Sequence, residues 1–160
     1  MKRARQRILA ATAAASASLL IVGVSAGQAS PGPVTRTFSF IGVPSSKTVT
    51  VVNIDSLTIN ARCNAQGAPV IFAFSGSNNA DLFGRYFDGL GRLHIVRNSS
   101  FDKGTRGVQL SATAGDFDAT GTILYEAFNG RVVTVQYAFD NATTLGKRRV
   151  CTVYGSYVAS

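Results

Sequence analysis

Two aspartates on alternate positions are the first feature of this sequence that could do chemistry. Asp116 and Asp118 stand in the run Gly115-Asp116-Phe117-Asp118-Ala119-Thr120-Gly121. Carboxylates with this spacing can present oxygens to Ca²⁺, and a pair of them can act as general acid and base. The run lacks the further ligands of a calcium loop, and aspartates that form a turn before a strand explain it more simply. We keep both as candidate site residues and predict no metal and no cofactor.

His94 and Glu126 are the other candidate site residues. His94 is the only histidine of the chain and stands between apolar residues in a strand-like segment. Catalysis through His94 would require an acid that orients its ring, and the sequence reveals none. A solvated position in a strand is therefore the simpler interpretation of His94. Glu126 is a further carboxylate that an enzyme acting on a polymer could use. No combination of these residues forms a catalytic signature.

The strongest local signal is Asn129-Gly130, which precedes Arg131 in the chain. A two-residue type I′ turn needs positive φ at both positions, and this pair tolerates it. The register of that turn predicts a core-facing set of Thr122, Leu124, Glu126, Phe128, Val133, Val135, Tyr137 and Phe139. A carboxylate on that face needs a partner. We therefore expect an ion pair at the rim between Glu126 and Arg131, its diagonal cross-strand neighbour.

The elements that must position these side chains are strands. Segments rich in Val, Ile, Thr, Phe and Tyr recur every ten to fifteen residues or so, between Gly, Asn, Asp, Ser and Pro. Such spacing is typical of a sandwich or barrel, and no longer segment has a helical period. The predicted strands are 34–41, 47–54, 56–63, 68–75, 80–87, 91–97, 106–113, 119–128, 131–139 and 147–158. Of these, 80–87 could instead form a helical turn. We predict an all-β fold, a single antiparallel β-sandwich of about nine or ten strands.

The two cysteines of the chain are Cys63 and Cys151. In an exported chain we expect them to form a disulfide, and the alternative is a pair of free thiols. Closing so long a loop would contribute on the order of 4–5 kcal/mol in the chain-entropy model. Alternation in the last strand places Cys151 and Val153 on the core side, and Tyr154 and Ser156 on the other.

The N-terminus predicts export. Lys2, Arg3, Arg5 and Arg7 precede an uncharged run, 8–24, as in a secretory signal. Cleavage after Ala26 or after Ala29 fits the small residues there, and both sites stay open. An uncleaved anchor is the weaker alternative, because the run is rich in Ala and broken by Thr and Ser. We predict a signal peptide with a helix over 1–29, a flexible leader over 30–35, a domain over 36–160, and a secreted or cell-wall-associated protein.

Charge and aromatic content limit the partners. Four of the sixteen basic residues lie in the signal, so twelve remain against eight acidic residues, a net charge of +4. The basic residues are scattered at turns, so we expect no nucleic acid as partner, and no membrane after cleavage. Carbohydrate binding needs exposed aromatic rings. There is no Trp, and the remaining aromatic candidates are Tyr86, Phe87, Tyr125, Tyr154 and Tyr157. Aromatic residues in strands are usually in the core.

Four stretches carry a family resemblance. They are Leu57-Thr58-Ile59-Asn60-Ala61-Arg62-Cys63, Gly67-Ala68-Pro69-Val70, Asn129-Gly130-Arg131-Val132-Val133-Thr134-Val135 and Cys151-Thr152-Val153-Tyr154-Gly155. Over roughly residues 36 to 158 the pattern resembles small exported β-proteins of high-GC Gram-positive bacteria, a group without an assigned activity. The resemblance implies a disulfide-linked bacterial β-domain outside the cell and assigns no functional residues.

The sequence as a whole predicts an exported, non-enzymatic binding or structural module, with a cell-surface glycan or a protein as its partner. A rigid β-scaffold with few catalytic groups favours this function. The alternative is an extracellular hydrolase or lyase that acts on a polymer through Asp116, Asp118 or Glu126, because a fold alone does not decide function.

Overall fold

The computed structural model describes residues 32–111, 118–141, 144–145 and 148–160, with side chains except at 144, 145 and 148. Asp116 and the predicted signal peptide lie outside these ranges. The strands are β1 (Val34–Gly42), β2 (Val49–Ile54), β3 (Leu57–Cys63), β4 (Pro69–Ser75), β5 (Asp81–Phe87), β6 (Leu93–Asn98), β7 (Val108–Gln109), β8 (Asp118–Glu126), β9 (Val132–Asp140), β10 (Thr144–Leu145), β11 (Arg148–Arg149) and β12 (Cys151–Ala159). The described residues include no helix that could span a membrane.

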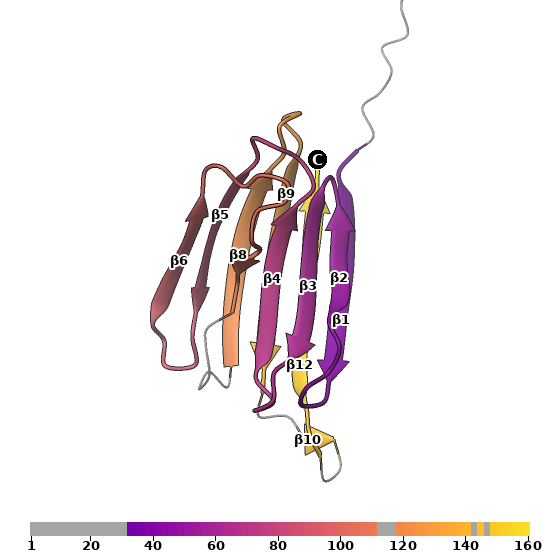
Figure 1. Ribbon diagram of the computed structural model, residues 1–160, viewed down its shortest axis with the longest axis vertical. Coiled ribbons are helices and arrows are strands. Elements are labelled where there is room, and N and C mark those ends of the chain that lie inside the picture. The colour runs from indigo at the N-terminus through magenta and orange to yellow at the C-terminus, as the bar shows by residue number, and fades with distance from the viewer. Residues whose placement is uncertain (1–31, 112–117, 142–143, 146–147) are drawn as a thin grey trace, which may run out of the picture. The chain divides into compact units, whose positions relative to one another are not determined.

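Ten strands form two antiparallel sheets (Figure 1). The six-stranded sheet has the order β1-β12-β9-β8-β5-β6, the four-stranded sheet has the order β2-β3-β4-β7, and β10 pairs with β11 alone. The predicted all-β sandwich is confirmed. The segment 80–87 is a strand, β5, and β1 begins at Val34, within the segment predicted as a leader. The sheet order places the first strand beside the last, so β12 lies inside the sheet and the C-terminus is integral to the fold.

The hairpin between β8 and β9 differs from the prediction. Its loop contains three residues, because Gly130 N–H donates to Ala127 O at 2.9 Å and Ala127 N–H donates to Arg131 O at 2.9 Å. Gly130 has φ +77°, whereas Asn129 does not have positive φ. This is a type I turn followed by a left-handed glycine, the second common way to close a hairpin. A two-residue loop with positive φ at both positions occurs instead at Asp55 and Ser56.

The extra loop residue reverses the predicted face of β8. Tyr125 faces Val133, and Ile123 faces Val135, where the type I′ turn would have placed Leu124 opposite Val135. Tyr125 and Ile123 are buried, whereas Leu124 is 44% exposed. The predicted core face of β9 is correct, but Thr122, Leu124, Glu126 and Phe128 do not face the core. A shift of one residue moves every side chain of a strand to the other face.

The predicted ion pair between Arg131 and Glu126 is also wrong, for the same reason. Glu126 is exposed on the outer face of the six-stranded sheet. Arg131 forms an ion pair with Asp55 instead, with 3.0 Å between Nε and Oδ1. This pair joins the tip of the β8–β9 hairpin to the tip of the β2–β3 hairpin, and so links the two sheets at one end of the sandwich.

One hydrophobic core fills the space between the sheets. Its largest fully buried side chains include Tyr125, Phe101, Phe139, Leu57, Ile59, Ile71, Leu82, Leu110 and Ile123. Tyr125 is the largest of these, and its hydroxyl oxygen lies 3.2 Å from Ser75 Oγ and 3.1 Å from Ser77 Oγ. Phe101, from the loop after β6, packs edge-on against Tyr125 with ring centroids 6.1 Å apart.

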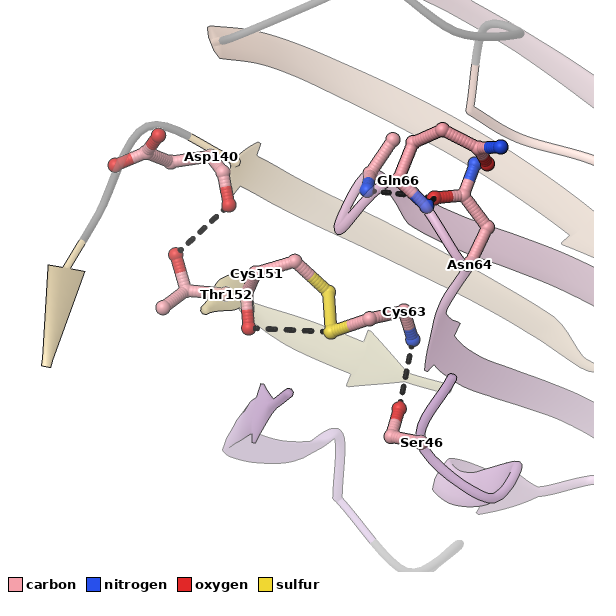
Figure 2. Close-up of a disulfide and its surroundings, with 8 residues drawn as sticks. Ser46, Cys63, Asn64, Gln66, Asp140, Cys151 and Thr152 are labelled. Carbon is pink, nitrogen blue, oxygen red and sulfur yellow. Dashed lines mark hydrogen bonds between the residues drawn. A yellow bond between two sulfur atoms is a disulfide. The ribbon is translucent and has the colours of Figure 1, made fainter. Parts of the chain in front are cut away.

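The disulfide joins the end of β3 to the start of β12, and hence one sheet to the other (Figure 2). Cys63 and Cys151 are 5.9 Å apart at Cα and almost fully buried. Ser46 Oγ accepts a hydrogen bond from the Cys63 amide at 2.8 Å, which fixes the end of β3. The predicted pairing and the predicted core side of β12 are both confirmed.

Candidate functional site: a concave sheet face

The outer face of the six-stranded sheet carries a hollow of about 900 Å³. Its side chains come from the outward positions of five neighbouring strands, β1, β12, β9, β8 and β5. The outward residues that line it are Thr37, Ser39, Arg85, Phe87, Thr120, Thr122, Gln136, Ala138, Tyr154 and Ser156. The hollow is shallow and open to solvent, and it brings polar groups and rings together in one place.

The outward residues form two rows that cross the strands. From β1 to β5, one row reads Thr37, Ser156, Gln136, Thr122 and Arg85, and the next reads Ser39, Tyr154, Ala138, Thr120 and Phe87. The first row offers hydroxyl and amide groups that both donate and accept hydrogen bonds, and ends on one guanidinium. The second row carries a ring near each end. The face is thus polar in its middle and aromatic at two separate points.

Tyr154 and Phe87 are the two outward rings that line this hollow, and they are 55% and 46% exposed. The other aromatic candidates, Tyr86, Tyr125 and Tyr157, are buried. Three strand spacings separate Tyr154 from Phe87 in the ladder, which corresponds to about 14 Å. One small ring-shaped ligand cannot contact both, whereas an extended oligomer lying across the strands can.

A row of rings and glycines lies on the inner face, between the two outward rows. It reads Phe38, Gly155, Tyr137, Gly121, Tyr86 and His94 from β1 to β6. A Cβ added to Gly121 would meet Tyr137 Cζ at 2.5 Å, and one added to Gly155 would meet Phe38 Cζ at 2.7 Å. Each ring therefore covers the neighbouring glycine. Glycine beside an aromatic residue is a common device where a sheet curves, and Gly121 and Gly155 both line the hollow.

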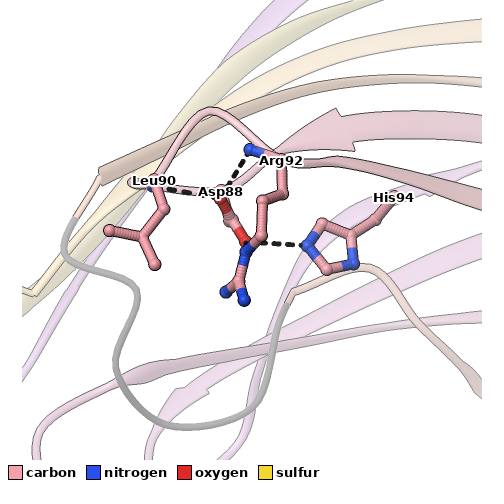
Figure 3. Close-up of polar contacts among 4 residues, drawn as sticks. All are labelled: Asp88, Leu90, Arg92 and His94. Atoms are coloured by element: carbon pink, nitrogen blue, oxygen red, sulfur yellow. Dashed lines mark hydrogen bonds and ion pairs between the residues drawn. The ribbon is translucent and has the colours of Figure 1, made fainter.

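His94 ends this inner row and has a partner that the sequence analysis missed (Figure 3). Its Nε2 lies 2.9 Å from Asp88 Oδ2, and its ring stacks on Tyr86 with centroids 4.6 Å apart. The fully buried Asp88 side chain also accepts hydrogen bonds from the Arg92 side chain, at 2.6 Å, and from the Leu90 and Arg92 amides. The signal available in the sequence was Asp88-Gly89, a turn dipeptide, six residues before the histidine. The cluster fixes the β5–β6 turn.

The carboxylate of Asp88 makes the fold sensitive to acid. Burial acts to raise the pKa of Asp88, but the hydrogen bonds from His94 and Arg92 outweigh it and hold the pKa well below the ordinary value of 3.8. The resulting stabilisation is complete above that value and is lost as the pH falls below it.

We expect Asp88→Asn to lower Tm at pH 7 by more than Asp102→Asn does. The Asp88 carboxylate accepts hydrogen bonds from side chains and from two backbone amides, whereas Asp102 Oδ1 accepts an amide hydrogen bond from Asn79. Between pH 5 and pH 2.5 the difference in Tm between Asp88→Asn and the wild type should shrink. Thermal unfolding followed by circular dichroism across this range measures both effects. A difference that stays constant with pH would show that the carboxylate charge of Asp88 does not stabilise the fold.

Asp118 faces Asp140 across the β8–β9 ladder, at the end of the sheet beyond the row of Tyr154 and Phe87. Desolvation of its carboxyl group, and then the charge of Asp140 and a hydrogen bond with it, raise the pKa of Asp118. A carboxyl whose pKa is raised by folding destabilises the fold when it is ionised, so this penalty is absent in acid and appears as the pH rises.

We expect Asp118→Asn to stabilise the domain at pH 7 by about 0.2–1 kcal/mol, the usual range for one cross-strand pair. At pH 3 the variant and the wild type should have equal stability, because the carboxyl is then protonated in both the folded and unfolded chain. Urea unfolding at the two pH values measures this. Equal gains at both would contradict the charge repulsion, and Asp102→Asn serves as the control.

The candidate residues from the sequence do not form one site. Asp118 and Glu126 are the first and last residues of β8, about 27 Å apart along an extended strand, and His94 lies on the inner side of β6. Asp116 lies outside the described residues. Among the side chains that are described, no three or more His, Cys, Asp or Glu come together as a metal site. Two of the described arginines form ion pairs at separate places, Arg92 with Asp88 and Arg131 with Asp55.

A second, smaller hollow of about 340 Å³ adjoins the first on β5, β6 and β8. It is lined by Phe83, Gly84, Arg85, Leu93, Ile95, Thr122 and Leu124. This hollow could not be predicted from the sequence, because the predicted hairpin register placed Leu124 in the core.

The chain matches no family model, no curated protein and no solved structure at a significant level. Its function therefore has to be inferred from the face itself.

Proposed function

We propose that this domain is a non-enzymatic module that binds an extended glycan across the concave face of the six-stranded sheet. The observation that carries the proposal is the hollow in which Tyr154 and Phe87 stand about 14 Å apart, with hydroxyl and amide side chains between them. A sugar ring has an apolar face and a polar rim. Exposed aromatic rings can stack on the apolar face of the sugar. Gln136, Thr122 and Ser156 can form hydrogen bonds with its polar rim.

The proposal includes export. The basic and apolar N-terminal segments of the sequence support a signal peptide, and the disulfide between Cys63 and Cys151 is compatible with an oxidising compartment. Outside a bacterial cell, polysaccharides of the wall and of the medium are the abundant extended ligands. A rigid face that crosses five strands suits such a chain.

The test is a glycan array probed with the purified protein and three variants. Tyr154→Ala and Phe87→Ala should each weaken binding about tenfold or more, which corresponds to about 1.4 kcal/mol. Phe128→Ala is the matched control, because Phe128 is a ring that is 74% exposed at the hairpin tip and does not line the hollow. Absence of any glycan ligand, or equal binding by all the variants, would refute the proposal.

A hydrolase or lyase that acts on the same polymer is the second candidate, and one observation favours it. Asp118 and Asp140 face each other directly across the β8–β9 ladder, and a hydrogen bond joins their carboxyl groups. A proton shared by the pair would supply an acid beside a carboxylate. Release of new reducing ends from a bound glycan, abolished by Asp118→Asn and by Asp140→Asn, would establish this function.

A further inference from the structure

The smaller hollow is apolar in a place where a solvated sheet face is normally polar. Leu93 and Ile95 are 51% and 74% exposed, and Phe83 and Leu124 are each 44% exposed. These four side chains occupy neighbouring outward positions on β6, β5 and β8. A cluster of exposed apolar side chains on one face usually marks a site of interaction.

Arg85 lies between the two hollows and lines both of them. In the part of the chain that is described, no acidic side chain forms an ion pair with Arg85 or with Arg97. Arg97 lies over the Phe83 ring instead, with Cζ 5.0 Å from the centroid. Of the outward acids, Asp81 and Glu126 face each other at the end of the sheet beyond Phe83, and Asp118 and Asp140 face each other at the opposite end, beyond the row of Tyr154 and Phe87. The border between the polar and apolar hollows is therefore positively charged.

We infer that the ligand is a single anionic amphiphile: a glycan joined through a phosphate or similar anionic group to an alkyl chain. The inference rests on the proposed function, because it adds a tail site to the same face. The row that holds Tyr154 and Phe87 continues on β6 to Leu93, so a glycan lying across the strands leads directly to the apolar hollow. The anionic group would meet Arg85, and the alkyl chain would cover Ile95 and Leu124.

The geometry favours one lipid-linked molecule over a membrane surface. The apolar side chains line a hollow in a sheet face, and they border a polar hollow that would have to be dehydrated against a bilayer. A single amphiphile would place its glycan in the polar hollow and its alkyl chain in the apolar hollow. Dimerisation through the β6 edge would instead cover the exposed apolar side chains of the smaller hollow with a second copy of the chain. The experiment below distinguishes this outcome.

The experiment titrates the full-length protein with dodecyl phosphate below its micelle-forming concentration, by calorimetry and by ¹H–¹⁵N shift mapping. Dodecyltrimethylammonium has the same tail with the opposite charge, and should bind at least tenfold more weakly. Arg85→Gln and Ile95→Ser should each weaken dodecyl phosphate binding at least tenfold. Arg62→Gln, an exposed arginine on β3 of the other sheet, should have no effect.

Equal binding of the two detergents, no effect of Arg85→Gln, or a stable dimer by light scattering that Ile95→Ser dissolves would overturn the inference. Binding of the array glycan without binding of dodecyl phosphate would overturn the tail site alone. Binding of dodecyl phosphate at β5 and β6 without any glycan ligand would overturn the proposed function and leave the anionic tail site standing.

Discussion

Tyr125→Ala should destabilise the domain by about 3–5 kcal/mol, whereas Leu124→Ala should cost less than about 1 kcal/mol. Tyr125 is fully buried, and its hydroxyl contacts the hydroxyls of Ser75 and Ser77. Truncation leaves a cavity and removes one hydrogen-bond partner from the buried Ser75 hydroxyl and from the half-buried Ser77 hydroxyl. Leu124 is its neighbour in the chain but points to the outer face, where 44% of the residue's surface is already exposed. Urea unfolding of the two variants measures the difference.

This pair of variants decides the register of the β8–β9 hairpin. If the loop had two residues, Leu124 would lie in the core and Tyr125 outside, and the order of the two effects would be reversed. Phe128→Ala is the control, because Phe128 is predicted inward by the two-residue loop and is 74% exposed in the three-residue loop. A large loss of stability in Phe128→Ala or Leu124→Ala would contradict the structure.

Removal of the disulfide should have an effect of similar size, about 4–5 kcal/mol, since the bond closes a loop across 88 positions of the chain. The double variant Cys63→Ala with Cys151→Ala avoids free thiols, and alanine suits the buried positions. Guanidinium unfolding of the double variant and of the wild type measures the loss. Wild-type protein unfolded in a reductant should match the double variant, which separates the cross-link from the substitutions.

A loss below about 1 kcal/mol would show that the bond does not restrict the unfolded chain as the entropy model requires. The end of β3 would then be held by its other contacts, such as the hydrogen bond from the Cys63 amide to Ser46. The effect should be larger than that of any single exposed side chain, because the disulfide is the covalent tie between the two sheets.

The strands could be predicted from the sequence because alternation and turn residues are local signals. The last strand shows this, since the alternation of its side chains alone places Cys151, Val153 and Tyr157 on the core side. The Asn129-Gly130 hairpin could not be resolved in the same way. Asn-Gly suits both a two-residue and a three-residue loop, and the choice is made by packing of Tyr125 against the other sheet, which is not a local property.

The functional face was less accessible to prediction than the fold. Alternation did place Tyr154 and Ser156 on the side away from the core. However, the hollow depends on strands distant in sequence, because β1 lies beside β12 and β8 lies beside β5. Residue spacing contains no information on that order. The acid beside His94 was missed for a related reason, since Asp88-Gly89 is a common turn dipeptide and does not indicate a carboxylate buried beside His94.

Shift mapping with the strongest soluble oligosaccharide from the array tests the proposed binding face most directly. ¹H–¹⁵N spectra of the protein should show perturbed amides on β12, β9, β8 and β5, centred on Tyr154, Gln136 and Phe87, with β2, β3 and β4 unchanged. Perturbations confined to the four-stranded sheet or to the hairpin tips would contradict the assignment of this concave face as the binding site.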